Sequence, residues 1–126
     1  MAQKIFKLLI VEDEQMLLKA LSAKFTKENF KVSVALNGEE GLKKALKERP
    51  DLILLDIVMP VMDGMTMLKH LRKDKWGKNA QVIVLTNLSD GTVAEALENN
   101  VYDYLLKADW NISDVVKKVR ERLNIK

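Results

Sequence analysis

Short runs of apolar residues alternate along the chain with longer segments in which apolar residues recur every three or four positions. The short runs predict five strands, at residues 5–11, 31–35, 51–55, 81–86 and 102–106. The first, third and fourth runs are almost continuously apolar, which is typical of strands covered on both faces in a parallel sheet. The second and fifth are more mixed, so we expect them at the sheet edges.

The longer segments predict a helix after each strand. Their apolar positions are Leu17, Leu18, Leu21 and Phe25; Leu42, Ala45 and Leu46; Met67, Leu68 and Leu71; Val93 and Leu97; and Ile112, Val115, Val116, Val119 and Leu123. Two helix starts are marked by an asparagine with an acidic residue three positions later, Asn37 with Glu40 and Asn111 with Asp114. Because strands and helices alternate without a linker, the sequence predicts one α/β domain over residues 1–126, made of five βα units.

Composition narrows the possible chemistry. The 126 residues are 48% apolar and 31% charged, as in a globular domain, and they include no cysteine and a single histidine, His70. Disulfides, thiolate metal sites and multi-histidine zinc sites are therefore excluded. The net charge of +3 comes from lysines scattered among acidic residues, so we expect no direct binding of nucleic acid. No run is long enough for a membrane helix and the first residues do not resemble a signal peptide, so we expect a cytoplasmic protein.

Polar side chains follow the predicted strands at the point where each strand ends. Three carboxylates, residues 12–14, come after the first strand, and Asp56 closes the third. Thr86 ends the fourth strand and Lys107 follows the fifth. In an open parallel sheet, ligands bind outside the carboxyl ends of the strands. We therefore expect these side chains to share one crevice.

Each of these residues also has a simple structural explanation when it is taken alone. Acidic residues at a helix start complement the helix dipole, Thr86 is a β-branched strand residue, and Lys107 can be a solvated strand end. Three adjacent carboxylates repel one another unless a cation neutralises them, and such oxygen ligands select Mg²⁺ or Ca²⁺. With a hydroxyl and an ammonium facing the same space, the crevice suits a phosphoryl group, with Asp56 as the nucleophile that forms an acyl phosphate.

Five ordered segments carry a resemblance to a known family. They are residues 11–14 (Val-Glu-Asp-Glu), 54–60 (Leu-Leu-Asp-Ile-Val-Met-Pro) with Asp63-Gly64, 84–86 (Val-Leu-Thr) and 103–107 (Asp-Tyr-Leu-Leu-Lys). Over essentially its whole length, the chain resembles the receiver domain of two-component response regulators. The resemblance implies a doubly wound, flavodoxin-like (βα)5 fold with strand order 2-1-3-4-5.

The resemblance also implies a phosphorylation site that depends on a metal ion. Asp56 would be the phosphoacceptor. Mg²⁺ would be bound by Asp13, Asp56 and the backbone carbonyl of Val58, with Glu12 acting through water. These roles are carried over from the family to the matching positions of this sequence.

The resemblance further implies a switch and its partners. Thr86 and Lys107 would bind the phosphoryl oxygens, and Thr86 and Tyr104 would move on phosphorylation. The face made by the fourth helix, fifth strand and fifth helix would then change. The phosphoryl donor would be a sensor histidine kinase or a histidine phosphotransfer protein. The output would be a downstream protein partner or an output domain outside this chain.

Two other classes of protein remain as alternatives to a non-enzymatic switch. An aspartyl-phosphate-forming hydrolase resembling haloacid dehalogenases would need a second aspartate two residues after the first, where this chain has Val58. A flavodoxin-like binding module would need a phosphate-binding loop after the first strand, where Glu12, Asp13 and Glu14 would repel a phosphate. We therefore expect a signalling switch rather than an enzyme.

The residues flanking the acceptor suggest a slow loss of the phosphoryl group. In the receiver family, the positions two beyond the acceptor and two beyond the threonine border the path of attacking water. Here they are Val58 and Leu88. Because apolar side chains cannot orient that water, we expect a long-lived phosphorylated form.

Overall fold

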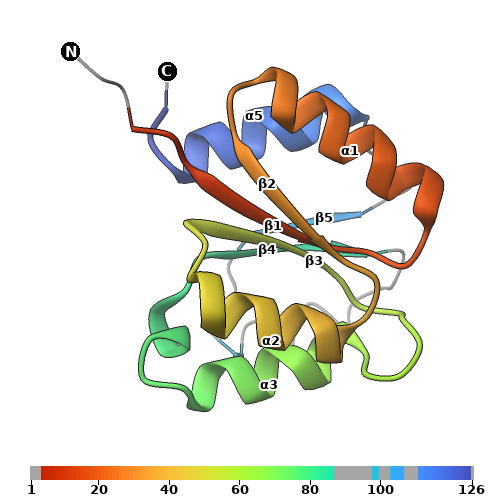
Figure 1. Cartoon of the computed structure of the whole chain (residues 1–126), viewed down its shortest axis with the longest axis vertical. Coiled ribbons are helices and arrows are strands. Elements are labelled where there is room, and N and C mark those ends of the chain that lie inside the picture. Colours follow the sequence, from red (N-terminus) through yellow and green to blue (C-terminus); the bar gives the residue numbers. More distant parts are fainter. Residues whose placement is uncertain (1–3, 87–97, 100–102, 107–110, 126) are drawn as a thin grey trace.

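The computed structural model describes residues 4–86, 98–99, 103–106 and 111–125 (Figure 1). These residues contain one parallel sheet with the strand order β2-β1-β3-β4-β5. Its strands are β1 (Lys7–Val11), β2 (Lys31–Ala35), β3 (Leu52–Asp56), β4 (Val82–Thr86) and β5 (Asp103–Leu106). The predicted α/β fold with a parallel sheet is confirmed, and β2 and β5 lie at its edges as expected.

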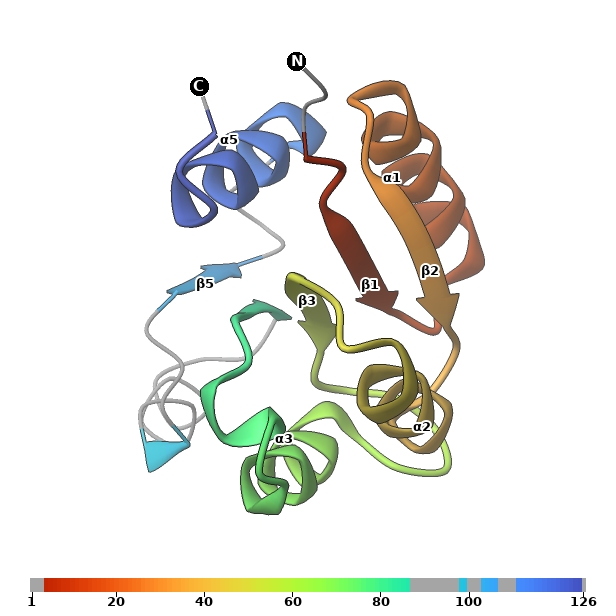
Figure 2. The same cartoon turned by 60° about the vertical axis from the view of Figure 1, so that its left-hand side comes forward.

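Helices cover both faces of this sheet. They are α1 (Gln15–Lys27), α2 (Gly38–Glu48), α3 (Gly64–Lys73) and α5 (Ile112–Arg122), together with a short 3-10 helix, η1 (Gly77–Asn79). Figures 1 and 2 show α1 and α5 on one face and α2 and α3 on the other. The helix predicted around Val93 and Leu97 lies outside the described residues. Within the described part of the chain, no helix is long and apolar enough to cross a membrane.

The apolar runs of the central strands serve two separate cores. In β1, Leu8 and Ile10 pack against α1 and α5, whereas Leu9 and Val11 pack against α2 and α3. Successive side chains of a strand point to opposite faces, so a strand covered on both sides must be apolar at every position. This is the physical reason for the unbroken apolar runs in β1, β3 and β4.

The predicted helix caps are present. The Asn37 side chain accepts a hydrogen bond from the Glu40 backbone N–H at 2.9 Å. Asn111 and Asp114 form a reciprocal capping box at the start of α5. Each cap satisfies backbone N–H groups that have no partner within the helix.

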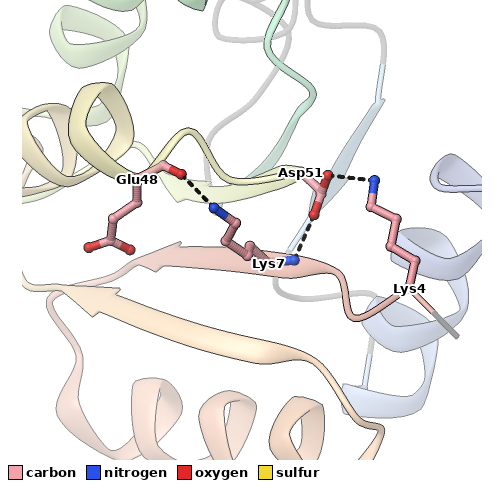
Figure 3. A network of polar contacts seen from close by, with 4 residues as sticks. All are labelled: Lys4, Lys7, Glu48 and Asp51. Atoms are coloured by element: carbon pink, nitrogen blue, oxygen red, sulfur yellow. Dashed lines mark hydrogen bonds and ion pairs between the residues drawn. The ribbon is translucent and has the colours of Figure 1, made fainter. Parts of the chain in front are cut away.

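A polar network fastens the amino-terminal end of the sheet (Figure 3). The Asp51 carboxylate accepts from the Lys7 backbone N–H at 2.7 Å and from Lys4 Nζ at 3.1 Å. Lys7 Nζ donates to the Glu48 carbonyl oxygen at 3.0 Å. The network joins β1 to the connection between α2 and β3, at the opposite end of β3 from Asp56.

Candidate functional site

Three carboxylates form an acidic cluster, Glu12, Asp13 and Asp56, at the carboxyl end of the sheet. Glu12 and Asp13 directly follow β1, and Asp56 is the last residue of β3. The two strands are neighbours, with Val11 beside Leu55, so the residues that follow them emerge side by side. One carboxylate oxygen from each residue lies within 4.8 Å of those from the other two. The structure thus brings together these three predicted site residues.

The acidic cluster is largely removed from water. Glu12 is fully buried and Asp56 is 5% exposed, whereas Asp13 is exposed. The Glu14 backbone N–H donates to Glu12 Oε2 at 3.0 Å, and the Ile57 backbone N–H donates to Asp56 Oδ1 at 2.8 Å. Burying a carboxylate is costly unless hydrogen bonds or a cation compensate for the lost hydration. The cluster is therefore a set of oxygen donors with the chemistry of a Mg²⁺ or Ca²⁺ site, open to solvent at Asp13.

Close packing of glycine backbone holds Asp56 in place. The Gly64 N–H donates to the Ile57 carbonyl oxygen at 2.8 Å, and a Cβ at Gly64 would collide with the carbonyl oxygen of Asp56. The side chain of Asp63 then caps α3 by accepting from the Thr66 N–H at 2.7 Å. The start of α3 is thereby seated against the backbone of the predicted acceptor.

A second glycine braces the loop after Asp56 from another element. The Gly38 N–H donates to the Met62 carbonyl oxygen at 2.8 Å, and a Cβ at Gly38 would collide with that oxygen. Sequence reasoning did not single out Gly38. Its partner lies 24 positions away in the chain, so no local pattern could have revealed the contact.

The loop between β3 and α3 exposes apolar side chains next to the acidic cluster. Val58 is 62% exposed and Val61 is 77% exposed, whereas Met59 between them is buried. Val61 has a φ of 67°, which is unfavourable for a β-branched residue. Val58, the proposed source of a carbonyl ligand, therefore presents an apolar side chain to solvent two residues beyond Asp56.

The other predicted site residues follow β4 and β5 or lie within these strands. Thr86 is the last residue of β4, one position beyond Leu85, which pairs with Asp56. Tyr104 lies in β5 beside Val84. The structure describes the backbone of these two residues, and Lys107 and Leu88 lie outside the described residues. The backbone of Thr86 reaches the same end of the sheet as the acidic cluster, as predicted.

The family model and the sequence relatives that match this chain agree with one another. The family model described as response regulator receiver domain matches residues 8–120. The chain is 36% identical over 117 residues to the response regulator PleD of Caulobacter vibrioides, and 39% identical over 111 residues to the probable C4-dicarboxylate response regulator DctR of Bacillus subtilis. These alignments cover 92% and 85% of this chain, but 25% and 48% of the relatives. The chain thus spans between a quarter and about half of the length of these relatives.

Solved structures with the same architecture include receiver domains and a CheY complex. A CheY-like response regulator receiver domain protein from Methanospirillum hungatei JF-1 superposes with a TM-score of 0.88 at 26% identity, covering 96% of this chain and 95% of that one. A chain of the CheX-CheY-BeF3-Mg+2 complex from Borrelia burgdorferi superposes with a TM-score of 0.84 at 31% identity, covering 96% and 90%.

Proposed function

The chain with this buried acidic cluster belongs to the response regulator receiver domain family, and on that premise we propose that Asp56 is its phosphoryl acceptor. Receiver domains are phosphorylation-dependent signalling modules of two-component systems. The observation that carries the proposal is the acidic cluster. Asp56 is the last residue of a buried strand, and its carboxylate oxygen lies within 4.8 Å of an oxygen from each of two further carboxylates. Its side chain is 5% exposed, so attack on phosphorus would take place in a partly desolvated site.

The chemical step transfers a phosphoryl group from a phosphohistidine. A carboxylate oxygen of Asp56 attacks the phosphorus, a P–O bond forms, and the P–N bond to the imidazole breaks. The electron pair of that bond returns to the imidazole nitrogen, which takes up a proton. The Ile57 N–H, which donates to Asp56 Oδ1, holds the carboxylate in place during the step.

The donor set of the acidic cluster suits Mg²⁺. We assign its ligands to Asp13, Asp56 and the backbone carbonyl of Val58, with Glu12 acting through water. When bound, the ion would neutralise charge on the phosphoryl oxygens. The Borrelia burgdorferi complex contains BeF3 and Mg²⁺, which supports the same ion for this chain.

The remaining roles follow the family pattern at matching positions. Thr86 and Lys107 bind the phosphoryl oxygens, and Thr86 and Tyr104 relay the change to the face formed by β5, α5 and the predicted helix around Val93 and Leu97. The position of Thr86 at the end of β4, beside β3, supports its role. The donor is a sensor histidine kinase or a phosphotransfer protein, and the output is a protein partner or a further domain.

Phosphorylation by a small acyl-phosphate donor tests the proposal. We expect intact mass to rise by one phosphoryl group in the presence of Mg²⁺ and not in the presence of a chelator. Asp56→Asn should abolish the increase. Asp51→Asn is the matched control, because Asp51 immediately precedes the same strand at its opposite end. A full mass increase in Asp56→Asn would contradict the assignment of the acceptor.

Two further observations on the same protein distinguish the two alternatives. A hydrolase would release phosphate continuously from the donor without stable mass addition. A flavodoxin-like module would carry a coloured flavin after purification. The carboxylates that follow β1 would repel a flavin phosphate, and Val58 stands where the hydrolase pattern has an acid, so no observation on the described residues favours either alternative.

A further inference from the structure

Arg72, near the end of α3, donates hydrogen bonds to backbone carbonyls in separate parts of the chain. Its Nη1 donates to the carbonyl oxygen of Gly77 at 2.7 Å and to that of Ala80, just before β4, at 2.8 Å. Its Nε donates to the carbonyl oxygen of Asn99 at 2.8 Å. Only residues 100–102 separate Asn99 from the start of β5. The guanidinium therefore joins the end of α3 to the chain that enters β4 and β5.

The surroundings of Arg72 favour well-defined bonds. Its side chain is half-buried, and desolvation lowers the pKa of its guanidinium from the ordinary value. The group nevertheless remains charged near neutral pH. Hydrogen bonds from a charged donor are stronger than hydrogen bonds between neutral groups. Partial burial strengthens them again, because the dielectric constant is lower there than in water. The planar fork of arginine places its donors on separate nitrogens, so that Nε and Nη1 reach carbonyls in different directions, whereas the three donors of lysine share one nitrogen.

The other end of α3 touches the proposed acceptor. Gly64, its first residue, donates to the Ile57 carbonyl oxygen and packs against the backbone of Asp56 too closely to admit a Cβ. The helix has ten residues, or about 15 Å. Leu68 and Leu71 on its inner face are fully buried, so α3 packs as a rigid element. A displacement at Gly64 would therefore reach Arg72.

We propose that Arg72 is a positioning residue that couples Asp56 to β5 by holding the Asn99 carbonyl against the end of α3. This inference rests on the proposed phosphorylation of Asp56. Phosphorylation replaces the single negative charge of the Asp56 carboxylate with about two on the phosphoryl group. The first turn of α3, whose N–H groups carry partial positive charge, begins against the backbone of Asp56. The added interaction biases the position of α3, and the bond from Nε to Asn99 transmits that bias to the strand that contains Tyr104.

A purely structural role for Arg72 predicts a different outcome. The two hydrogen bonds from Nη1 hold the segment between α3 and β4 against the end of α3. If these bonds were only structural, their loss would lower the free energy of unfolding of the unphosphorylated and the phosphorylated protein equally. Only coupling predicts that the response of β5 to phosphorylation depends on Arg72.

The first test uses the unsubstituted protein. Arginine Nε–H signals are recorded by ¹⁵N NMR with Mg²⁺, before and after addition of a small acyl-phosphate donor, and the extent of phosphorylation is measured by intact mass. The Arg72 signal should shift. The Arg49 signal should stay in place as an internal control, since Arg49 is exposed and follows α2 at the opposite end of β3 from Asp56. An unmoved Arg72 signal at full phosphorylation overturns the coupling.

The second test compares Arg72→Lys with the matched variant Arg49→Lys, whose exposed side chain follows α2. The measured response is the change in amide hydrogen exchange at residues 103–106 on phosphorylation. At equal extents of phosphorylation, we expect this response to shrink at least about twofold in Arg72→Lys and to persist in Arg49→Lys. An undiminished response in Arg72→Lys overturns the coupling alone.

Two further results are also decisive. Failure of the unsubstituted protein to gain phosphate on Asp56 overturns the proposed function, and the coupling falls with it. If Arg72→Lys does not fold, the NMR signals of the unsubstituted protein decide between the two roles.

Discussion

Asp56 illustrates, at the scale of a single residue, how an apolar strand can carry a reactive group. The four residues before it in β3 are fully buried aliphatic side chains, and Asp56 itself is 5% exposed. A carboxylate in such surroundings reduces stability unless its hydrogen bonds and a cation offset the loss of water. Its presence at the end of β3 is therefore better explained by chemistry than by folding.

The metal site can be tested through Asp13, the exposed member of the acidic cluster. Mg²⁺ should raise the melting temperature of the unsubstituted protein, because a ligand that binds only the folded state stabilises it by about 1.4 kcal/mol at ten times its Kd. Asp13→Asn should largely lose this stabilisation and should be no less stable than the unsubstituted protein in a chelator, since one of three repelling charges is removed. Thermal unfolding with and without Mg²⁺ measures both effects, and equal Mg²⁺ shifts in the two proteins would contradict the assignment.

Val58 provides a test of the expected long lifetime of the acyl phosphate. Its exposed apolar side chain, two residues beyond Asp56, offers no group to orient a water molecule. We expect the acyl phosphate to outlast seconds in Mg²⁺ and to decay about threefold faster or more in Val58→Gln, equivalent to about 0.7 kcal/mol in the barrier. Val61→Gln, in the same loop, serves as the control. Loss of the phosphoryl group within seconds from the unsubstituted protein would refute the expectation.

At the scale of elements, α3 and the loop before it contact both the acidic cluster and α2. The loop includes Val61 with a φ of 67°, a conformation that costs about 1–2 kcal/mol for a residue with a Cβ. Hydrogen bonds from Gly38 to Met62 and from Gly64 to Ile57 hold the loop despite this cost. The position of Val58 and the direction of α3 are thus decided by contacts with α2 and β3.

Gly64 is the element-scale test of this arrangement. Gly64→Ala places a Cβ against the carbonyl oxygen of Asp56, so α3 or β3 must shift. We expect a loss of about 1–3 kcal/mol in the free energy of unfolding and a lower rate of phosphorylation. Thr66→Ala, at an exposed position in the same helix, should stay within about 0.5 kcal/mol. Urea unfolding measures the first effect and intact mass measures the second. A Gly64→Ala protein as stable as Thr66→Ala would show that the close approach is unimportant.

At the scale of the whole molecule, two cores share one sheet. Leu54 belongs to the core under α1 and α5, and Leu55 belongs to the core under α2 and α3. Because adjacent residues of one strand serve both cores, loss of either core removes support from the other. We therefore propose that residues 1–126 behave as one cooperative domain.

Substitutions on the two faces of β3 test this cooperativity. Leu54→Ala and Leu55→Ala should each cost about 2–5 kcal/mol, since both side chains are fully buried. In both variants, circular dichroism and Trp fluorescence should report a single coincident urea transition. Two separate transitions in either variant would show that the faces unfold independently.

Much of the fold was predictable because its signals are local. The strand runs, the caps at Asn37 and Asn111, and the βα alternation depend on residues close in the sequence, and the structure agrees with them to within a residue or two. The strand order came from the family resemblance, because periodicity does not specify which strands are neighbours. The meeting of Glu12 and Asp13 with Asp56 followed from the rule that parallel strands end at one edge.

Several features were not predictable because their causes are non-local. Gly38 contacts Met62, Gly64 contacts Asp56, and Arg72 contacts Asn99, 27 residues away. Nothing in the neighbouring sequence of any of these residues indicates its partner. The apolar run that Asp56 closes is visible in the sequence, but the exposure of Asp13 beside it is visible only in the folded structure.

The amino-acid sequence alone determined the class of fold and the chemical groups available, because hydrophobic periodicity and side-chain chemistry are properties of the chain itself. The tertiary structure decided the distances among the three carboxylates, the exposure of each, and the contacts that bind α3 to Asp56 at one end and to Asn99 at the other. Those quantities arise when elements from distant parts of the chain pack together, so they exist only in the folded molecule.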